Sequence, residues 1–352
     1  MTFVQLPSEI GQKRLVFYLA MEEYLASDLT GIVGEGNDAF FLWQVPPTVI
    51  FGRNQVMEAE VNLQYCKEKG INLFRRKSGG GCVYSDYGNI MLSYITSSTD
   101  VAFTFDKYLQ RLALAMRRAG LNAFRSGRKD ILEDGKKVSG NSYCLQPSSS
   151  IVHGTMLFDT DFDELERAIT PSSAKIRSKG VDSVRSHVTN IKQYFEVSQV
   201  PWQRKFADIA EYRKYLISEF CGNKDESGKI VSINRVTLTQ EQVKDIEKIE
   251  AEYLDPDFLS GRKHSFTVER GFRIDGVGEF VLNLEMDMDK IVSCQLAGDY
   301  FLLKEGLNEY LSTLLKGASD TLESVSARLE KVDLEDYVKG LSVKTMLDKM
   351  YN

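Results

Sequence analysis

Three consecutive glycines follow two arginines within RRKSGGGCVY, residues 75–84, whose neighbours have the apolar character of strands. Because glycine lacks a side chain and tolerates positive φ, its main chain can lie against another molecule and donate N–H groups to anionic oxygens. Arg75 and Arg76 before the glycines and Asn89 after them add cationic and neutral donors. These residues predict a site for an anionic ligand. The alternative is a glycine-rich bend or β-bulge whose arginines only solvate a strand edge.

The common phosphate-binding motifs do not fit this segment. A Walker A loop has Lys and Ser or Thr after its last glycine, and a dinucleotide fingerprint has the spacing G-x-G-x-x-G at the start of a helix. SGGGCVYSDYGN, residues 78–89, has neither pattern. The glycines therefore indicate close contact with a ligand without identifying it.

A second group of polar residues lies in KDILEDGKKVSGNSYC, residues 129–144. Asp134 and Gly135 form a dipeptide that favours a tight hairpin turn. Such a turn lets Asp130 and Lys137, on its two strands, face one another. The alternative is that the lysines after the turn are ordinary exposed charges.

The histidines and cysteines do not indicate a zinc or iron site. His153 lies in the apolar run IVHGTMLF, residues 151–158, and no second histidine or cysteine stands at a ligand spacing from it. A hydrogen-bonded structural histidine is the simpler interpretation. The 5 cysteines include no C-x-x-C pair, which fits a reducing compartment and no disulfide framework.

The periodicities around these motifs predict a mixed α/β chain with antiparallel pairing. The first predicted helix, 14–27, is amphipathic. A second, 58–70, ends at Gly70, and a third, 104–120, has Thr104 as its N-cap and Gly120 as its stop. The other predicted elements are strands at 39–45, 48–53, 71–78, 89–96, 121–124, 129–145 and 150–158, a helix at 239–254, three strands between 264 and 301, and helices after 304.

Length and composition predict a globular protein of two domains. The 352 residues exceed the size at which one core usually keeps growing. DPDFLSG, residues 255–261, interrupts the pattern, so we expect domains at 1–250 and 251–352. A net charge of -6 argues against nucleic acid as a partner. The absence of a signal-like start and of a long apolar run predicts no membrane contact and a cytoplasmic location.

Four segments in order resemble the successive signatures of lipoate-protein ligase A, in the biotin/lipoate protein ligase superfamily: RRKSGGGCVYSDYGN, DGKKVSGNSY, HGTMLF and KGVDSVRSHVTN. The resemblance covers most of the first 250 residues, and GDYF at 298–301 is similar to part of the family's accessory C-terminal domain. It implies an α+β fold like that of class II synthetases and biotin ligases. A large domain of mixed, mostly antiparallel sheets flanked by helices would precede a small α+β C-terminal accessory domain.

The resemblance also implies a reaction. ATP would activate lipoate to lipoyl-AMP with release of pyrophosphate, and a carrier lysine would then form an amide. The implied carriers are E2 subunits of 2-oxoacid dehydrogenases and the glycine cleavage H protein. Lys137 would be the catalytic cation, because negative charge builds on phosphate and carbonyl oxygens during these steps. Asp130 would bind Mg²⁺ through the ATP phosphates.

The resemblance assigns further residues to each ligand. Those implied to bind ATP or the adenylate are Arg75, Arg76, Ser78, Gly79, Gly80, Gly81, Cys82, Val83, Tyr84, Asn89, Lys137, Ser183 and Arg185. Those implied to bind lipoate are Lys137, Gly140, His153 and Gly154, with HGTMLF and the first helix forming an apolar slot. Two positions depart from the family: Ser85 stands where many relatives have histidine, and Cys82 stands where alanine is common.

Two other functions compete with the ligase. An octanoyl or lipoyl transferase uses a cysteine thioester and no ATP, but FRSGRKD, residues 124–130, has no cysteine before the motif lysine. A non-catalytic lipoate-binding scaffold would keep the pocket alone, and the presence of both Lys137 and Asp130 argues against it. Biotin ligase is disfavoured because its basic glycine loop is absent.

Overall fold

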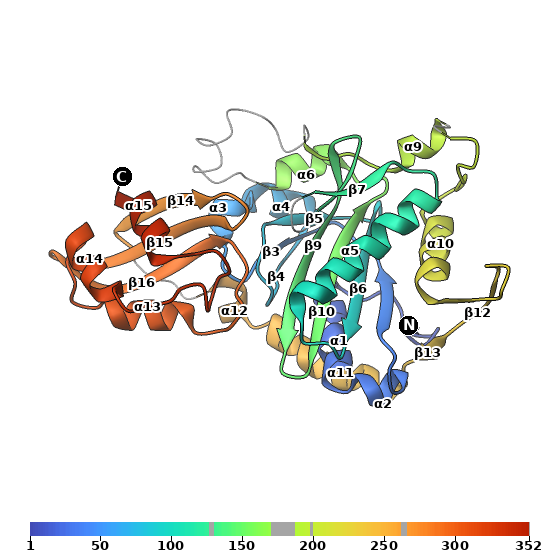
Figure 1. The fold of residues 1–352 in the computed structure, drawn as a ribbon, viewed down its shortest axis with the longest axis horizontal. Helices are drawn as coiled ribbons and strands as arrows, with labels where there is room; N and C mark the ends of the chain where they lie inside the picture. Colours follow the sequence, from blue (N-terminus) through green and yellow to red (C-terminus); the bar gives the residue numbers. More distant parts are fainter. Residues whose placement is uncertain (127–129, 170–186, 198–199, 262–265, 352) are drawn as a thin grey trace.

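An eight-stranded mixed sheet forms the centre of the larger part of the chain (Figure 1). The computed structural model describes residues 1–126, 130–169, 187–197, 200–261 and 266–351. β1 pairs in parallel with both of its neighbours, and the other pairs of this sheet are antiparallel, as expected. The strand order is β13 (Arg235–Thr237), β1 (Thr2–Gln5), β2 (Ala39–Trp43), β6 (Asn89–Thr96), β10 (Ser149–Leu157), β9 (Lys136–Gln146), β8 (Asp130–Glu133) and β7 (Ala123–Ser126).

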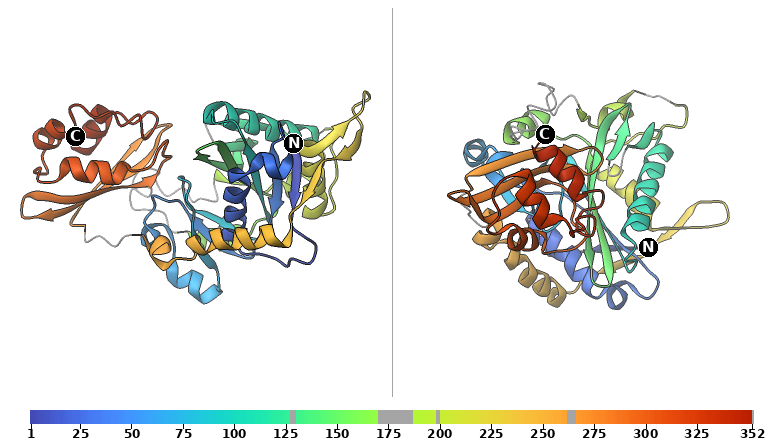
Figure 2. Two further views of the ribbon diagram at one scale, coloured as in Figure 1. Left: turned by 90° about the horizontal axis from the view of Figure 1, so that it is seen from below. Right: turned by 60° about the vertical axis from the view of Figure 1, so that its left-hand side comes forward.

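Helices cover both faces of this sheet. Figure 2 shows α5 on one side and α11 on the opposite side, with the sheet between them. α1 packs on β6 and β10 and is covered by α11. Because it lies between these layers, α1 is buried almost all round, and the prediction that it is amphipathic was wrong. The helices of this part are α1 (Leu15–Ser27), α2 (Leu29–Val33), α5 (Val101–Arg118), α9 (Lys192–Glu196), α10 (Ile209–Cys221) and α11 (Gln240–Tyr253).

The N-terminus of α5 differs from the prediction. The helix begins at Val101, and Asp100 caps it by accepting a hydrogen bond at 3.0 Å from the Phe103 N–H. Thr104, the predicted cap, is a buried residue of the helix. Both residue types are good caps, and the extra turn buries Thr104 against the core. Gly120, with φ 100°, follows the end of the helix as expected.

A second, three-stranded sheet carries the glycine triplet. β3 (Thr48–Phe51) is its central strand, parallel to β4 (Asn72–Arg75) and antiparallel to β5 (Val83–Ser85). The glycines lie in the connection between β4 and β5. The predicted helix at 58–70 is interrupted into α3 (Met57–Glu60) and α4 (Leu63–Lys69), and α6 (Phe162–Ala168) packs beside them. Gly70 ends α4 in a left-handed conformation, as expected.

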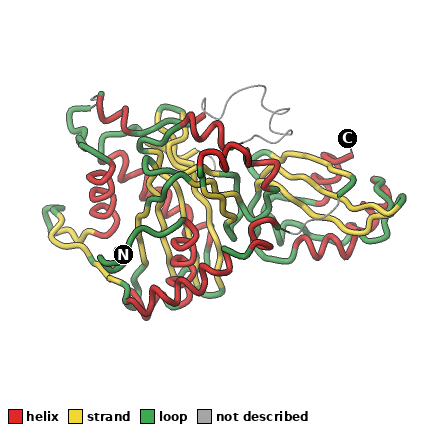
Figure 3. Tube along the Cα trace, turned by 180° about the vertical axis from the view of Figure 1, so that it is seen from behind, coloured by secondary structure: helices red, strands yellow, loops and turns green. Residues whose placement is uncertain are grey.

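The C-terminal part, whose strands and helices Figure 3 shows beside the larger part, has its own hydrophobic core between Phe272 and Met350. Its three-stranded antiparallel meander confirms the expected strands, and three helices cover one face of it. The predicted boundary at residue 250 stays a prediction. The elements from residue 256 on are α12 (Pro256–Ser260), β14 (Val268–Ile274), β15 (Gly278–Asp287), β16 (Lys290–Asp299), α13 (Leu307–Leu315), α14 (Leu322–Leu329) and α15 (Val343–Tyr351). In the larger part, β11 (Gly222–Lys224) and β12 (Ile230–Ile233) form a hairpin that projects outward.

Candidate active site

The hairpin of β8 and β9 brings Asp130 and Lys137 together. Its turn has positive φ at both central residues, 48° at Asp134 and 77° at Gly135, which is the backbone twist that the sequence favours for a two-residue hairpin. Lys137 Nζ lies 2.9 Å from Asp130 Oδ1, and the two side chains are 39% and 35% exposed. The prediction that they face one another is confirmed. The pair presents a fixed but accessible ammonium group.

Gly140 gives the ammonium group of Lys137 its space. A Cβ atom at residue 140 would lie 2.7 Å from both Cε and Nζ of Lys137, closer than such contacts occur. Gly140 also pairs directly with Asp130 across the hairpin. A side chain here would therefore displace the ammonium group.

The glycine triplet contacts the C-terminal part of the chain. A Cβ at Gly79 would lie 2.2 Å from the carbonyl oxygen of Tyr300, and the Gly80 N–H donates to that oxygen at 3.2 Å. Gly80 has φ 98°, and a Cβ there would lie 3.3 Å from the ring of Phe301. Because Gly79 and Gly80 have no side chains, Tyr300 and Phe301 of the same chain can lie against them. The sequence did not predict this contact. Contact of these glycines with a nucleotide stays a prediction.

Arg75 is buried and holds main-chain carbonyls. Its guanidinium donates to the carbonyl oxygens of Arg53 at 2.9 Å and Gln55 at 2.8 Å, and it lies 4.6 Å from the ring centre of Phe51. Burial lowers the pKa of Arg75 to about 10. The interpretation that this arginine only solvates a strand edge is excluded by its burial.

Arg76 shapes the glycine triplet. Its Nη2 donates to the carbonyl oxygens of Gly79 at 2.9 Å and Gly81 at 2.7 Å. Burial lowers its pKa to about 10, opposed by the nearby carboxylate of Asp299. Arg76 therefore fixes the conformation of the loop from within, and its contact with phosphate stays a prediction.

His153 belongs to a buried hydrogen-bond network. Its Nε2 lies 2.9 Å from Ser78 Oγ, and its Nδ1 lies 2.8 Å from Glu22 Oε2. Ser93 Oγ donates to Glu22 Oε1 at 2.5 Å and accepts from Trp43 Nε1 at 2.9 Å. Two predicted residues, Ser78 and His153, are thus brought together. The sequence analysis missed Glu22, whose signal was a carboxylate within an apolar helix.

A tight cavity adjoins this network. Its apolar lining includes Leu19 of α1 and Ile151 of β10, and Cys144 and Tyr253 also line it. The rest of its lining is polar or charged and consists of Glu22, Glu23, Arg76, Lys77, Ser78 and His153. Residues of α1 and of HGTMLF both line this cavity, and the apolar slot for lipoate stays a prediction.

Asn89 and Gly154 lie in the sheet beside the hairpin. Asn89 is fully buried and accepts a hydrogen bond at 3.2 Å from the Met156 N–H. Among the described residues, nothing accepts from its Nδ2. A Cβ at Gly154 would lie 2.0 Å from Asn141 Oδ1, so glycine here admits the Asn141 side chain.

The remaining predicted site residues follow the triplet or lie outside the described chain. Cys82 and Val83 are half-buried, and Tyr84 is buried in the small sheet, where burial raises its pKa. Ser183 and Arg185 lie outside the described residues. No cluster of three or more metal-ligating side chains occurs in the described part of the chain, and none of its helices is long and apolar enough to cross a membrane.

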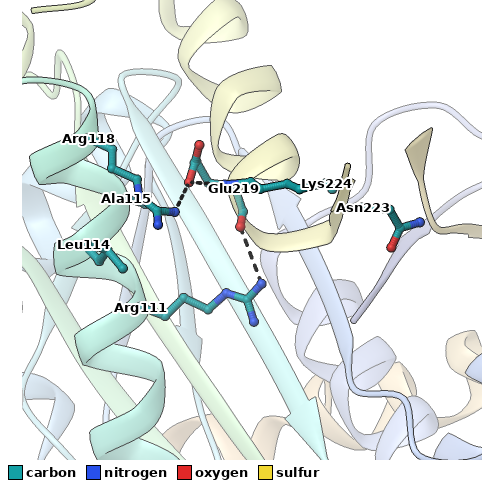
Figure 4. A pocket seen from close by; sticks show the side chains of 8 residues that line it. Arg111, Leu114, Ala115, Arg118, Glu219, Asn223 and Lys224 are labelled. Carbon is teal, nitrogen blue, oxygen red and sulfur yellow. Dashed lines mark hydrogen bonds and ion pairs between the residues drawn. The ribbon is translucent and has the colours of Figure 1, made fainter. Parts of the chain in front are cut away.

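A polar groove of about 430 Å³ lies elsewhere, between α5 and the end of α10 (Figure 4). Arg118 Nη1 lies 2.7 Å from Glu219, and Lys224 lies 3.6 Å from the same carboxylate. Arg111 donates to the carbonyl oxygen of Phe220 at 2.6 Å. These charges tie the end of α10 to α5 and have no contact with the hairpin lysine.

Solved lipoate ligases share this fold. "Crystal structure of P. falciparum LipL1 in complex lipoate" has a TM-score of 0.72 at 20% identity and covers 99% of this chain and 97% of that chain. "Crystal structure of lipoate-protein ligase A bound with ATP" has a TM-score of 0.58 at 24% identity and covers 74% and 98%. The fold therefore defines the class of this protein as that of the lipoate-ligase fold.

Sequence comparison identifies the family. The model of the lipoyl protein ligase A/B catalytic domain matches residues 15–221, and that of the bacterial lipoate protein ligase C-terminus matches residues 263–350. Lipoate-protein ligase LplJ of Bacillus subtilis is 32% identical over 95% of this chain and 96% of its own. Lipoate–protein ligase 1 of Staphylococcus aureus is 30% identical over 91% of each chain. The chain belongs to the lipoate-protein ligase family.

Proposed function

We propose that this enzyme activates free lipoate with ATP and transfers the lipoyl group to a lysine of a carrier protein. The carriers are the lipoyl domains of 2-oxoacid dehydrogenase E2 subunits and the glycine cleavage H protein. Family membership supports the reaction class. The observation on which the mechanism depends is the ammonium group of Lys137, held by Asp130 and given space by Gly140.

In the first step, a lipoate carboxylate oxygen attacks the α-phosphorus of ATP, and pyrophosphate leaves. Negative charge increases on the phosphoryl oxygens, so a preorganised cation stabilises this transition state more than the ground state. Lys137 is suited to this because its position is already fixed. Asn89 adds a buried amide whose Nδ2 has no acceptor among the described residues.

Asp130 fits the role of the magnesium-binding residue. Mg²⁺ commonly binds through one or two carboxylates together with substrate phosphates. The carboxylate of Asp130 is 35% exposed beside Lys137 and is therefore accessible to a metal that arrives with ATP. The ion would neutralise phosphate charge when bound.

In the second step, the neutral amine of the carrier lysine attacks the acyl carbon of lipoyl-AMP. The acyl–phosphate bond breaks, AMP leaves, and the amine loses a proton. Lys137 stabilises the charge that develops on the carbonyl oxygen. For the acyl chain to lie beside Leu19 and Ile151, near His153, the walls of this cavity must separate, because its present volume is about 10 Å³, which is room for about one water molecule.

The transferase alternative requires a reactive thiol at the acyl group. Cys144 lines the cavity, but burial raises its pKa to about 11, so little of it is thiolate at neutral pH. This favours the ligase over a cysteine-dependent transferase.

Lipoate-dependent exchange between ATP and pyrophosphate tests the proposal. The wild-type enzyme should catalyse the exchange, and Lys137→Ala should lower it by about 10²-fold or more, because removal of a single oxyanion donor has this effect. Lys136→Ala, one residue away and exposed, is the matched control. A wild-type enzyme that modifies a carrier without ATP would contradict the proposal.

A further inference from the structure

β7 is the edge strand of the eight-stranded sheet, and it lies beside the hairpin that carries Lys137. Among the described strands, β7 pairs only with β8. An unpaired edge is available to another protein unless it is covered or blunted. In Figure 1, β7 lies at the upper side of the sheet, next to the strands that carry Asp130 and Lys137.

The register places Phe124 of β7 on the same face of the sheet as Lys137. Phe124 of β7 is opposite Leu132, and Leu132 is opposite Lys137. Two rows further on, and therefore on the same face, Ser126 is opposite Asp130. Side chains of directly opposed residues lie on one face of a sheet. Neighbouring strands are about 4.8 Å apart, so Phe124 lies about 10 Å from Lys137 along this row.

Two exposed aromatic side chains belong to this edge. Phe124 is 43% exposed and Trp202 is 68% exposed. The segment of Trp202 lies against the chain that leads into β7, because the Arg204 N–H donates to the Ala119 carbonyl at 3.0 Å and Gln203 lies against Gly120. Single exposed apolar residues are common. Phe124 on the face of Lys137 and Trp202 in the segment at the end of α5 are better explained by a binding surface that extends over both sides of the edge, where such residues dominate the energy.

Exposed cations surround the same edge, although the chain carries a net charge of -6. Arg117 Nη1 donates to the Ala123 carbonyl of β7 at 3.0 Å. Lys136 lies in the adjacent row with Glu133 and Ala123, so its side chain is on the face of the sheet opposite to that of Lys137 and borders the edge from that side. Arg204 and Lys205 flank Trp202 in the sequence, and all four cations are exposed. The complementary partner therefore has an acidic surface.

We propose that this docking edge, consisting of β7 with Phe124, Trp202 and the four cations, binds the carrier domain during the second step. The carrier rests its acidic surface on the edge and extends its acceptor lysine over Phe124 and Leu132 toward Lys137. The four-carbon stem of a lysine allows the domain itself to remain beside the edge. This inference rests on the proposed function, because only the transfer step requires a protein acceptor.

The test separates activation from transfer. Phe124→Ser and Trp202→Ser are compared with wild type in three assays: lipoate-dependent pyrophosphate exchange, trapping of lipoyl-AMP by hydroxylamine, and modification of an apo-lipoyl domain from an E2 subunit. Loss of an aromatic anchor is expected to lower kcat/KM for the lipoyl domain by about tenfold or more, through KM. Exchange and trapping should remain within about twofold of wild type. Raised salt should increase KM for the lipoyl domain.

Two further variants make the outcome specific. Phe124→Leu keeps an apolar anchor and should retain most of the transfer activity. Val231→Ser removes a similarly exposed side chain, 63% exposed, from the projecting β11–β12 hairpin and should change nothing. Unchanged transfer in both serine variants overturns the docking edge, as does a loss of exchange in parallel with transfer. A wild-type enzyme without lipoate-dependent exchange overturns the proposed function instead, while direct titration of the apo-lipoyl domain still tests the docking edge.

Discussion

Gly140 lies directly against the ammonium group of Lys137, and replacing it with alanine tests whether the position of that cation is essential. The new Cβ would lie 2.7 Å from Nζ, whereas ordinary contacts begin at 3.4 Å. The ammonium group must therefore move by about 0.7 Å and give up its 2.9 Å contact with Asp130. A misplacement of about 1 Å can reduce a rate by about 10²-fold, so we expect a loss of this order in lipoate-dependent exchange.

The stability of the fold should change little in Gly140→Ala. The displaced atoms belong to the end of a flexible side chain, and the ion pair is more than a third exposed, so its loss costs about 0.2 to 1 kcal/mol. Gly11→Ala is the control, because a Cβ there meets no atom within 4 Å. Exchange kinetics and urea unfolding are measured on both variants. Exchange within threefold of wild type in Gly140→Ala, or a loss explained by unfolding, would refute the reasoning.

Two further changes test other parts of the structure. Burial raises the pKa of Glu133 to about 7 from 4.5. Because the pKa is higher in the folded state, the free energy of unfolding of the wild type falls as pH rises from 4.5 to 7. The free energy of unfolding of Glu133→Gln in urea, taken relative to that of the wild type, should therefore increase by about 3 kcal/mol between pH 4.5 and 8. Parallel stability curves would contradict this expectation. Gly79→Ala should accelerate amide hydrogen exchange at Gly80 by about tenfold, because its Cβ displaces Tyr300 and breaks the hydrogen bond from the Gly80 N–H. An unchanged rate at Gly80 would show that the contact between the two parts of the chain is not maintained in solution.

The helices and strands were mostly predictable from the sequence, but their environment was not. Segment 14–27 was predicted to be a helix, yet the burial of α1 on nearly all sides depends on α11, more than 200 residues later. Residues 39–45 and 48–53 were expected as two linked strands, and the structure assigns them to different sheets. Periodicity reports that a segment is apolar, but the number of elements that pack on it is a property of the whole fold.

The site divides in the same way. Asp130 and Lys137 could be paired from the sequence because they are only seven positions apart, with one turn between them. The contact of Glu22 with His153 joins residues 131 positions apart, and no spacing rule connects them. The filling of the glycine triplet by Tyr300 is a contact of the same long-range kind.

The sequence by itself determined the local geometry: the turn at Asp134 and Gly135, the helix stop at Gly70, and through them the pairing of Lys137 with Asp130. These features depend on the φ preferences and hydrogen bonds of residues that are close along the chain. Only the tertiary structure decided that Arg76 holds the glycine loop from within, that His153 contacts Glu22, and that Phe124 lies on the face of Lys137. These contacts form when segments that are distant in the sequence pack together, and the residues adjacent to each of them in the sequence do not specify that packing.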